Sequence, residues 1–333
     1  MPGLNTSLFI SVQALMAEQG ALNVTTNNIA NINTPGYTRE VPILSEAQTF
    51  KEGAVQFGGG VTMQQFQSVR DQLLQLRMYE ETQQQNNSQT QLNSLTQIES
   101  IFSDPTQGIG GALSAFFNSL SQLSTNPTDN SARQQVLTTA NNLAISFHQA
   151  VSGLGTIQSD LDQSVPQVVN QINQLTQQIA KLNGQVAQLQ GLGQEPGTVQ
   201  DQRDQLITQL SSLVNISVTQ TEHGLTLTTA NGVPLVVANQ SFGLQTSTTT
   251  NGFENVVAQG QDITTQITGG KLAGTLNIRD QVIPGLLSQL DTLANQFASS
   301  INTQHQAGFD LSGNAGQNFF TPPTAVADRK SVV

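Results

Sequence analysis

The 333-residue chain contains no cysteine and no tryptophan, and its 11 basic and 22 acidic residues make up only 10 % of it, against about 25 % in ordinary globular proteins. The absence of cysteine excludes disulfides, thiolate metal sites and cysteine nucleophiles. Its Lys and Arg are scattered singly, which argues against binding to a nucleic-acid backbone. No stretch approaches the ~18 consecutive apolar residues of a membrane-spanning helix, and residues 1–20 lack the basic start of a secretory signal.

Apolar residues near the start of the chain follow a 3.5-residue repeat. Leu8, Val12, Leu15, Leu22 and Ile29, which we call the N-terminal seam, advance by 4, 3, 7 and 7 residues. This spacing predicts one narrow apolar stripe along a helix of about six turns. Because such a stripe is marginal in water by itself, we expect the seam to need a partner.

The rest of the pattern predicts further helices interrupted by strands. Helical spacing covers about residues 69–102 and 113–123, and Ser131 is the expected N-cap of the next helix. Apolar residues from Leu161 to Leu189 step alternately by 4 and 3, as in two-stranded coiled coils, and Pro166 is expected to start or kink this helix. Residues 199–213 are expected to fold back as an antiparallel helix.

The expected fold class is therefore mainly α with a β insertion: an elongated bundle of long coiled-coil-like helices plus a small β-rich domain. Thr-rich, Gly-punctuated sequence predicts the strands. The expected parts are an N-terminal helix with an Asn-rich motif and extended chain in residues 1–66, a long helical bundle in 67–214, the β-rich insertion in 215–280, a return helix in 281–307, and a loop and tail in 308–333.

A search for chemistry predicts no catalytic, cofactor-binding or metal site. His148, His223 and His305 stand outside any metal-ligand spacing and are interpreted as packing, turn and helix-end residues. Residues 310–316 resemble the start of a calcium loop but have Ala315 where the turn glycine belongs, so an ordinary polar turn is favoured. Within residues 201–204, Arg203 and Asp204 are interpreted as charges at a helix start that form a surface pair worth under about 1 kcal/mol. Gly58–Gly60 lacks the ending of a phosphate loop.

The Asn-rich motif after the N-terminal helix is similar to a known signature. Residues 27–39 resemble that of flagellar axial proteins of the rod, hook and hook-associated group. The motif residues singled out are Asn27, Asn28, Ile29, Ala30, Asn31, Asn33, Pro35, Gly36, Tyr37 and Arg39. Residues 131–134, 201–206, 279–284 and 302–310, leading to Phe319 and Phe320, resemble segments of the hook-associated protein 1 family, so the ordered set points to its N-terminal part.

This resemblance implies a non-enzymatic structural subunit of the bacterial flagellum, forming the junction between hook and filament. It implies export through the flagellar type III apparatus to the extracellular flagellum, with help from an export chaperone. Expected partners are further copies of the chain in a helical axial assembly, the hook protein and the second junction protein. Family members continue beyond this point and end in a helix that pairs with the N-terminal one, so the chain is expected to be incomplete at Val333.

Three other functions stay open at this point. The chain is alternatively a hook or rod subunit of the same group, or a secreted coiled-coil effector or adhesin that uses the Leu161–Leu189 repeat on a host partner. A hydrolase with a dispersed Ser-His-Asp site is the enzymatic alternative.

Overall fold

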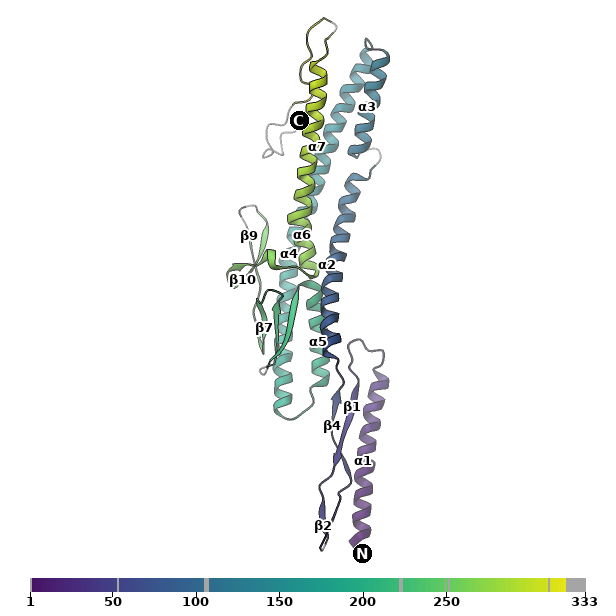
Figure 1. The fold of residues 1–333 in the computed structure, drawn as a ribbon, viewed down its shortest axis with the longest axis vertical. Coiled ribbons are helices and arrows are strands. Elements are labelled where there is room, and N and C mark those ends of the chain that lie inside the picture. Colours follow the sequence, from purple (N-terminus) through teal and green to yellow (C-terminus); the bar gives the residue numbers. More distant parts are fainter. Residues whose placement is uncertain are drawn as a thin grey trace. The chain divides into compact units, whose positions relative to one another are not determined.

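The computed structural model describes residues 2–52, 54–104, 108–221, 224–248, 250, 252–310 and 312–321 (Figure 1). Its helices are α1 (Pro2–Ala30), α2 (Gln72–Phe102), α3 (Ile109–Thr125), α4 (Asn130–Gly191), α5 (Gly197–Leu213), α6 (Gly270–Asn277) and α7 (Ile283–Gln306), with a 3₁₀ turn at Thr264–Gln266 and a π turn at Ile278–Val282. Its strands are β1 (Glu40–Glu46), β2 (Phe50–Glu52), β3 (Val55–Phe57), β4 (Val61–Ser68), β5 (Ile216–Thr221), β6 (Gly224–Thr229), β7 (Pro234–Val237), β8 (Gln240–Ser241), β9 (Gln245–Thr248), β10 (Glu254–Ala258) and β11 (Gln261–Asp262).

The predicted fold class, mainly α with a β insertion, is confirmed by this element order. The chain packs into two compact units. One combines residues 1–86, 168–246 and 256–270, and the other combines residues 87–167, 247–255 and 271–333. Among the described residues, no helix combines the length and apolarity needed to cross a bilayer. The predicted five-part domain division stays a prediction, because each of the two compact units combines stretches that are separate in the sequence.

In the first unit, α1 lies against the antiparallel pair of β1 and β4 (Figure 1). The buried positions on α1 are Ala17 and Val24. Gly20 lies so close to the Met63 side chain that a Cβ atom there would collide with the sulfur. Small residues thus form the face of α1 that meets the strands, which leaves its larger apolar residues on other faces.

The C-terminal half of α4 forms the main core of the first unit together with α5 and a four-stranded antiparallel sheet of order β5-β6-β7-β8. Asn183 on α4 donates to the carbonyls of Leu225 and Ala238 on the sheet side. Ile172, Ile179, Ile207, Leu210, Leu227 and Leu235 are fully buried. The apolar repeat on α4 is therefore covered from within the chain, and residues 199–213 form a helix as predicted.

In the second unit, the core gathers around Phe116, which is fully buried. Its ring lies 5.7 Å from that of Phe297 and about 6 Å from those of Phe319 and Phe320. The side-chain amide of Asn302 bonds to both the N–H and the carbonyl of Phe320, each at 2.8 Å. The segment after α7 is thereby tied back onto its own helix.

Arg279, on the π turn between α6 and α7, is 1 % exposed and fully paired. Its guanidinium bonds both carboxylate oxygens of Asp280, donates to Asp162 at 2.6 Å and donates to the Glu254 carbonyl at 2.7 Å. The ring of Phe253 covers the guanidinium carbon at 5.5 Å. One buried cation thus joins the π turn, α4 and the start of β10.

Two local predictions about α4, its N-cap and a helix start at Pro166, are wrong, whereas the alternative of a kink at Pro166 stays a prediction. The helix begins at Asn130, and the N–H of Ser131 donates to the Asp129 carboxylate, so Asp129 rather than Ser131 supplies the capping oxygen. Pro166 does not start a helix, because α4 runs without interruption from Asn130 to Gly191 with Pro166 inside it. Core burial on either side of the proline, at Val165 and Val168, compensates the lost backbone hydrogen bond.

We predict that replacing Arg279 with methionine lowers the free energy of unfolding by about 3–5 kcal/mol, because Asp162 and Asp280 would lose their cation partner in a largely buried site. Urea unfolding of the chain measures this loss. The matched control is Arg77→Met at an exposed position of α2, where we expect a change within about 0.5 kcal/mol. Equal effects of the two substitutions would contradict the assigned role of Arg279.

Candidate functional site

The Asn-rich motif closes the end of α1 through its own side chains. The Asn31 side chain donates to the Asn27 side-chain oxygen at 2.9 Å and to the Asn27 carbonyl at 3.0 Å. Its oxygen in turn accepts the Thr34 hydroxyl. Asparagine competes for backbone groups in this way at helix ends, so these residues stop the helix and start the turn that leads to Pro35.

Asn28 connects this turn to the first strand. Its side-chain oxygen accepts the Tyr37 hydroxyl and the Glu40 N–H, each at 2.9 Å, and its side-chain nitrogen donates to the Glu40 carbonyl at 2.8 Å. Three of its hydrogen-bonding positions are therefore used inside the chain. Replacing this asparagine would leave the Tyr37 hydroxyl and the first residue of β1 without these partners.

Two motifs that lie far apart in the sequence meet at the start of α5. The Asp201 carboxylate accepts the Thr38 N–H at 3.0 Å and the Thr38 hydroxyl at 2.6 Å. The Gln205 side chain donates to the Pro35 carbonyl. Gly36 has φ of +79°, and a Cβ atom there would collide with the Gln205 side chain, so glycine is required at this position.

Arg70, between β4 and α2, holds the same carboxylate from the other side. It donates to Asp201, to Asp204 at 2.6 Å and to the Gly197 carbonyl at 2.8 Å. The side chains of all three charged residues are 12–16 % exposed. We call Asn28, Tyr37, Thr38, Arg70, Asp201, Asp204 and Gln205 the joint, because they fasten the end of α1 and the start of β1 to α5.

Acidic groups crowd around the joint. Burial raises the pKa of the Glu40 carboxyl above its usual value, and the carboxylates of Asp201 and Glu195 add to this effect while a hydrogen bond from Asn27 opposes it. Burial also raises the pKa of the Tyr37 hydroxyl, again with help from Glu40 and Asp201. Since the folded chain binds the Glu40 proton more tightly than the unfolded chain does, protonation of this carboxyl on acidification stabilises the fold.

The N-terminal seam lies outside the joint and is open to solvent. Its side chains range from 40 % exposed at Val12 to 69 % at Leu15, and the neighbouring Phe9, Met16 and Ile32 are also more than half exposed. α1 buries Ala17 and Val24 instead, on the face that meets β1 and β4. Within the described part of the chain, nothing covers the seam.

The remaining motif residues are distributed unevenly. The structure brings Asn28, Tyr37 and the backbone of Pro35 and Gly36 into the joint, whereas Ala30, Asn33 and Arg39 are exposed beside it. Asn27 and Asn31 act locally at the helix end.

The residues searched for chemistry are separated from one another. His148 lies inside α4, the His305 ring contacts the Gln317 carbonyl, and His223 lies outside the described residues. The Asp310 carboxylate accepts hydrogen bonds from the Asn314 side-chain amide and from the backbone N–H groups of Asn314 and Ser312. These bonds form the expected polar turn, and they lower the pKa of the Asp310 carboxyl. In the described ranges, no three His, Cys, Asp or Glu side chains gather as a metal site.

The interpretation of Arg203 and Asp204 as a surface ion pair is wrong, because their side chains are only 9 % and 12 % exposed. The neighbouring Asp201 is also buried and binds a segment 163 residues away in the sequence. Arg70 was not predicted as a site residue. For Arg203 a signal was available in the sequence, because it precedes the buried Ile207 and Leu210 by 4 and 7 residues and so shares their helix face.

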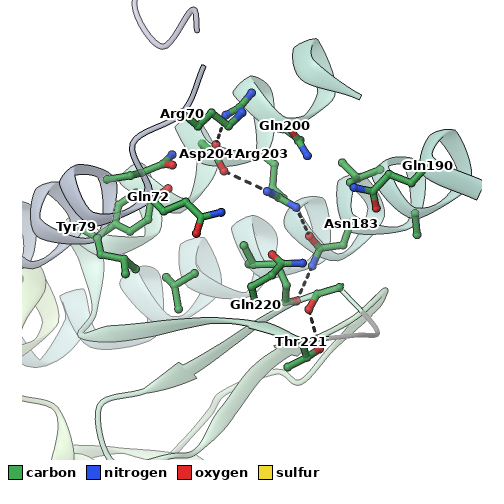
Figure 2. Close-up of a pocket in the computed structure, with 17 residues that line it drawn as sticks. Arg70, Gln72, Tyr79, Asn183, Gln190, Gln200, Arg203, Asp204, Gln220 and Thr221 are labelled. Atoms are coloured by element: carbon green, nitrogen blue, oxygen red, sulfur yellow. Dashed lines mark hydrogen bonds and ion pairs between the residues drawn. The ribbon is translucent and has the colours of Figure 1, made fainter. Parts of the chain in front are cut away.

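A cavity of about 650 Å³ adjoins the joint in the first unit. Figure 2 shows the Arg203 side chain reaching into it, with Gln72 and Tyr79 of α2, Asn183 and Gln190 of α4, and Gln220 and Thr221 of β5 around it. Arg70 and Asp204 line its edge, so the cavity and the joint share two residues. Six of the lining residues carry amide side chains, and Leu76, Val186, Ala187, Val218 and Leu225 add apolar surface.

Comparison with known proteins places these features in a family. The family model described as "Flagellar hook-associated protein FlgK helical domain" matches residues 95–320, and the model "Flagella basal body rod protein" matches residues 8–38. The chain is 31 % identical to flagellar hook-associated protein 1 of Salmonella typhimurium over 93 % of its own length and 58 % of that protein. It is 30 % identical to flagellar hook-associated protein 1 of Bacillus subtilis over 95 % of its length and 70 % of that protein.

A solved structure shares the fold. The flagellar hook junction protein FlgK from Burkholderia pseudomallei is 30 % identical and superposes with a TM-score of 0.64 over 75 % of this chain and 46 % of that one. The chain thus spans 58 % of the length of the Salmonella relative and under half of the solved chain. The two family matches, over residues 8–38 and 95–320, nonetheless include the joint residues Asn28, Tyr37 and Thr38 and those at the start of α5. The chain belongs to the flagellar hook-associated protein 1 family.

Proposed function

We propose that this chain is a structural subunit of the bacterial flagellum that forms part of the junction between hook and filament. The observation that carries the proposal is the family membership over 93 % of the chain, together with the exposed seam on α1. A row of apolar side chains open to water favours burial against another protein segment. The proposed role is therefore assembly rather than catalysis.

The proposed partners follow from that role. They are further copies of the chain in a helical axial assembly, the hook protein on one side and the second junction protein on the other, with an export chaperone before assembly. The proposed location is the extracellular flagellum. The relatives' names, which include the words hook-associated and hook junction, support this placement.

The alternatives have less support. The rod-protein match covers residues 8–38, which is the segment shared by the wider axial group, whereas the hook-associated match covers residues 95–320. An effector or adhesin would need the α4 repeat free for a partner, but Ile172 and Ile179 are already fully buried within the chain. A hydrolase would need its groups assembled, and His148 and His305 lie on different helices without a described carboxylate bond.

In this proposal the joint sets the direction in which α1 leaves the helical part of its unit. Asn28 fixes the end of α1 to β1, and Asp201 fixes the start of β1 to α5. The seam can then be presented at a defined place on the unit rather than on a freely moving helix. Several charge-assisted hydrogen bonds in a poorly solvated site are strong enough for this task.

We predict that immunogold labelling of an epitope-tagged chain in intact flagella marks one short band between hook and filament. The tag belongs in an exposed turn such as that at Gly252, which is part of neither the seam nor the joint. Removal of the filament should leave the band on the end of the hook. Labelling along the whole hook or along the rod would contradict the junction role and favour the alternative axial subunits.

We also predict that Asp201→Ala loosens the joint. Loss of the carboxylate leaves the Thr38 N–H without its acceptor and Arg70 with Asp204 as its one carboxylate partner, so amide exchange at residues 37–40 should accelerate by about tenfold or more. Hydrogen-exchange mass spectrometry measures this directly. Asp160→Ala, at an exposed position of α4, is the matched control and should leave exchange at residues 37–40 unchanged. Unchanged exchange in Asp201→Ala would refute the joint.

A further inference from the structure

The cavity beside the joint contains a buried guanidinium group, that of Arg203, in which one N–H donor has no hydrogen-bond acceptor. The Arg203 side chain is 9 % exposed, and its Nη1 makes one long hydrogen bond of 3.3 Å to Asn183. Its Nε lies 3.5 Å from the Asp204 carboxylate and has no hydrogen-bond partner. A buried donor without an acceptor destabilises the fold, so a group that brings acceptors into the cavity would be held there.

The charges around the cavity determine which kind of ligand it can bind. Among the described residues that line the cavity, Arg70 and Arg203 are positive and Asp204 is negative. Asp201 does not line the cavity but pairs with Arg70, so the charges of this group of four side chains balance. A further charge of either sign would have to be desolvated without a free counter-charge. The site therefore favours a neutral ligand that accepts and donates hydrogen bonds.

The lining matches such a ligand. Gln72, Gln75, Gln190, Gln200 and Gln220 surround the cavity, and each side-chain amide offers an oxygen acceptor and two N–H donors. Amide groups pair with one another through both functions at once. The side chains that best complement this cavity are therefore again glutamine and asparagine.

The chain itself carries such side chains in excess. It has 47 Gln and 27 Asn, more than twice its number of charged residues. The α4 segment before the cavity exposes a row of them, at Asn170, Gln171, Gln174, Gln177 and Gln178. Two copies that each carry a net charge of −11 repel one another unless they meet through neutral surfaces.

We propose that the amide-lined cavity around Arg203 is a docking site for glutamine and asparagine side chains of a second copy of this chain. The inference rests on the proposed function, since it assigns one contact between copies in the axial assembly. The donor surface and the cavity are different places on one molecule, so the contact is head-to-tail. Such contacts generate open helical arrays rather than closed dimers.

The test uses two substitutions on the same helix. Gln190 lines the cavity, whereas Gln188, two residues earlier, is exposed and does not line it. Gln190→Trp should fill the cavity and weaken self-association of the chain by about tenfold, or about 1.4 kcal/mol. Sedimentation velocity over a concentration series measures this loss. Gln188→Trp adds the same apolar surface outside the cavity and should stay within about twofold of the unmodified chain.

Ionic strength gives a second readout. A contact between neutral amides is screened little by salt, so we expect the association constant to change less than about threefold between 0.05 and 0.5 M NaCl. A photo-crosslinking amino acid at position 190 should join two copies of the chain, with the crosslink mapping to a Gln- or Asn-bearing segment. The same group at position 188 should give a weaker crosslink.

Three results would overturn the docking site. They are a chain that stays monomeric at the highest concentration reached, equal association of the Gln190→Trp and Gln188→Trp variants, and a crosslink from position 190 that stays within one copy. Each of these leaves the labelled band between hook and filament unaffected, so the docking site can fail while the junction role stands. Failure of the band itself would overturn the proposed function instead.

Discussion

The Asp201 carboxylate accepts the backbone N–H and the hydroxyl of Thr38 and is held from its other side by Arg70. This contact joins the segment after α1 to α5, across 163 residues of sequence. Around it, Asn28 organises the first residue of β1 and Gln205 holds the Pro35 carbonyl. Since the placement of α1 within its unit depends on these bonds, so does the direction in which the exposed seam points. A carboxylate with three donors in a site that is 12 % exposed is strong enough to carry that constraint.

The chain has few charged residues, and several of them form buried ion pairs. With 33 charged residues in 333, the chain still places Arg70, Arg203 and Arg279 in largely buried positions, each beside carboxylates. Arg279 saturates its donors and serves stability, whereas Arg203 leaves a donor without a partner and faces a cavity. Removal of most other charges leaves a surface of amides and hydroxyls that copies of the chain can share without electrostatic repulsion.

Periodicity in the sequence was enough to predict the helices, because a helix must repeat its apolar residues on one face to bury them. It predicted the fold class and the return of residues 199–213 for that reason. It did not predict which face of α1 is covered, since small residues such as Ala17 and Gly20 allow the close approach of β1 and β4. The joint could not be predicted from periodicity, because a sequence does not show which residue a charged side chain will pair with. Arg203 and Asp204 were therefore assigned to a surface pair, and Arg70 was not singled out at all. The family resemblance did place residues 27–39 and 201–206 in one ordered set, but said nothing of their contact.

The central claim, that residues 37–40 and the start of α5 form one joint, is tested most directly by a double-mutant cycle between Thr38 and Asp201. Thr38→Val removes the hydroxyl while keeping its shape, and Asp201→Asn removes the charge while keeping an acceptor. We expect an interaction energy of about 1–3 kcal/mol from urea unfolding of the four proteins, because each substitution alone disrupts a bond that the other also needs. Additivity within about 0.3 kcal/mol would contradict the claim, since residues that do not touch behave independently.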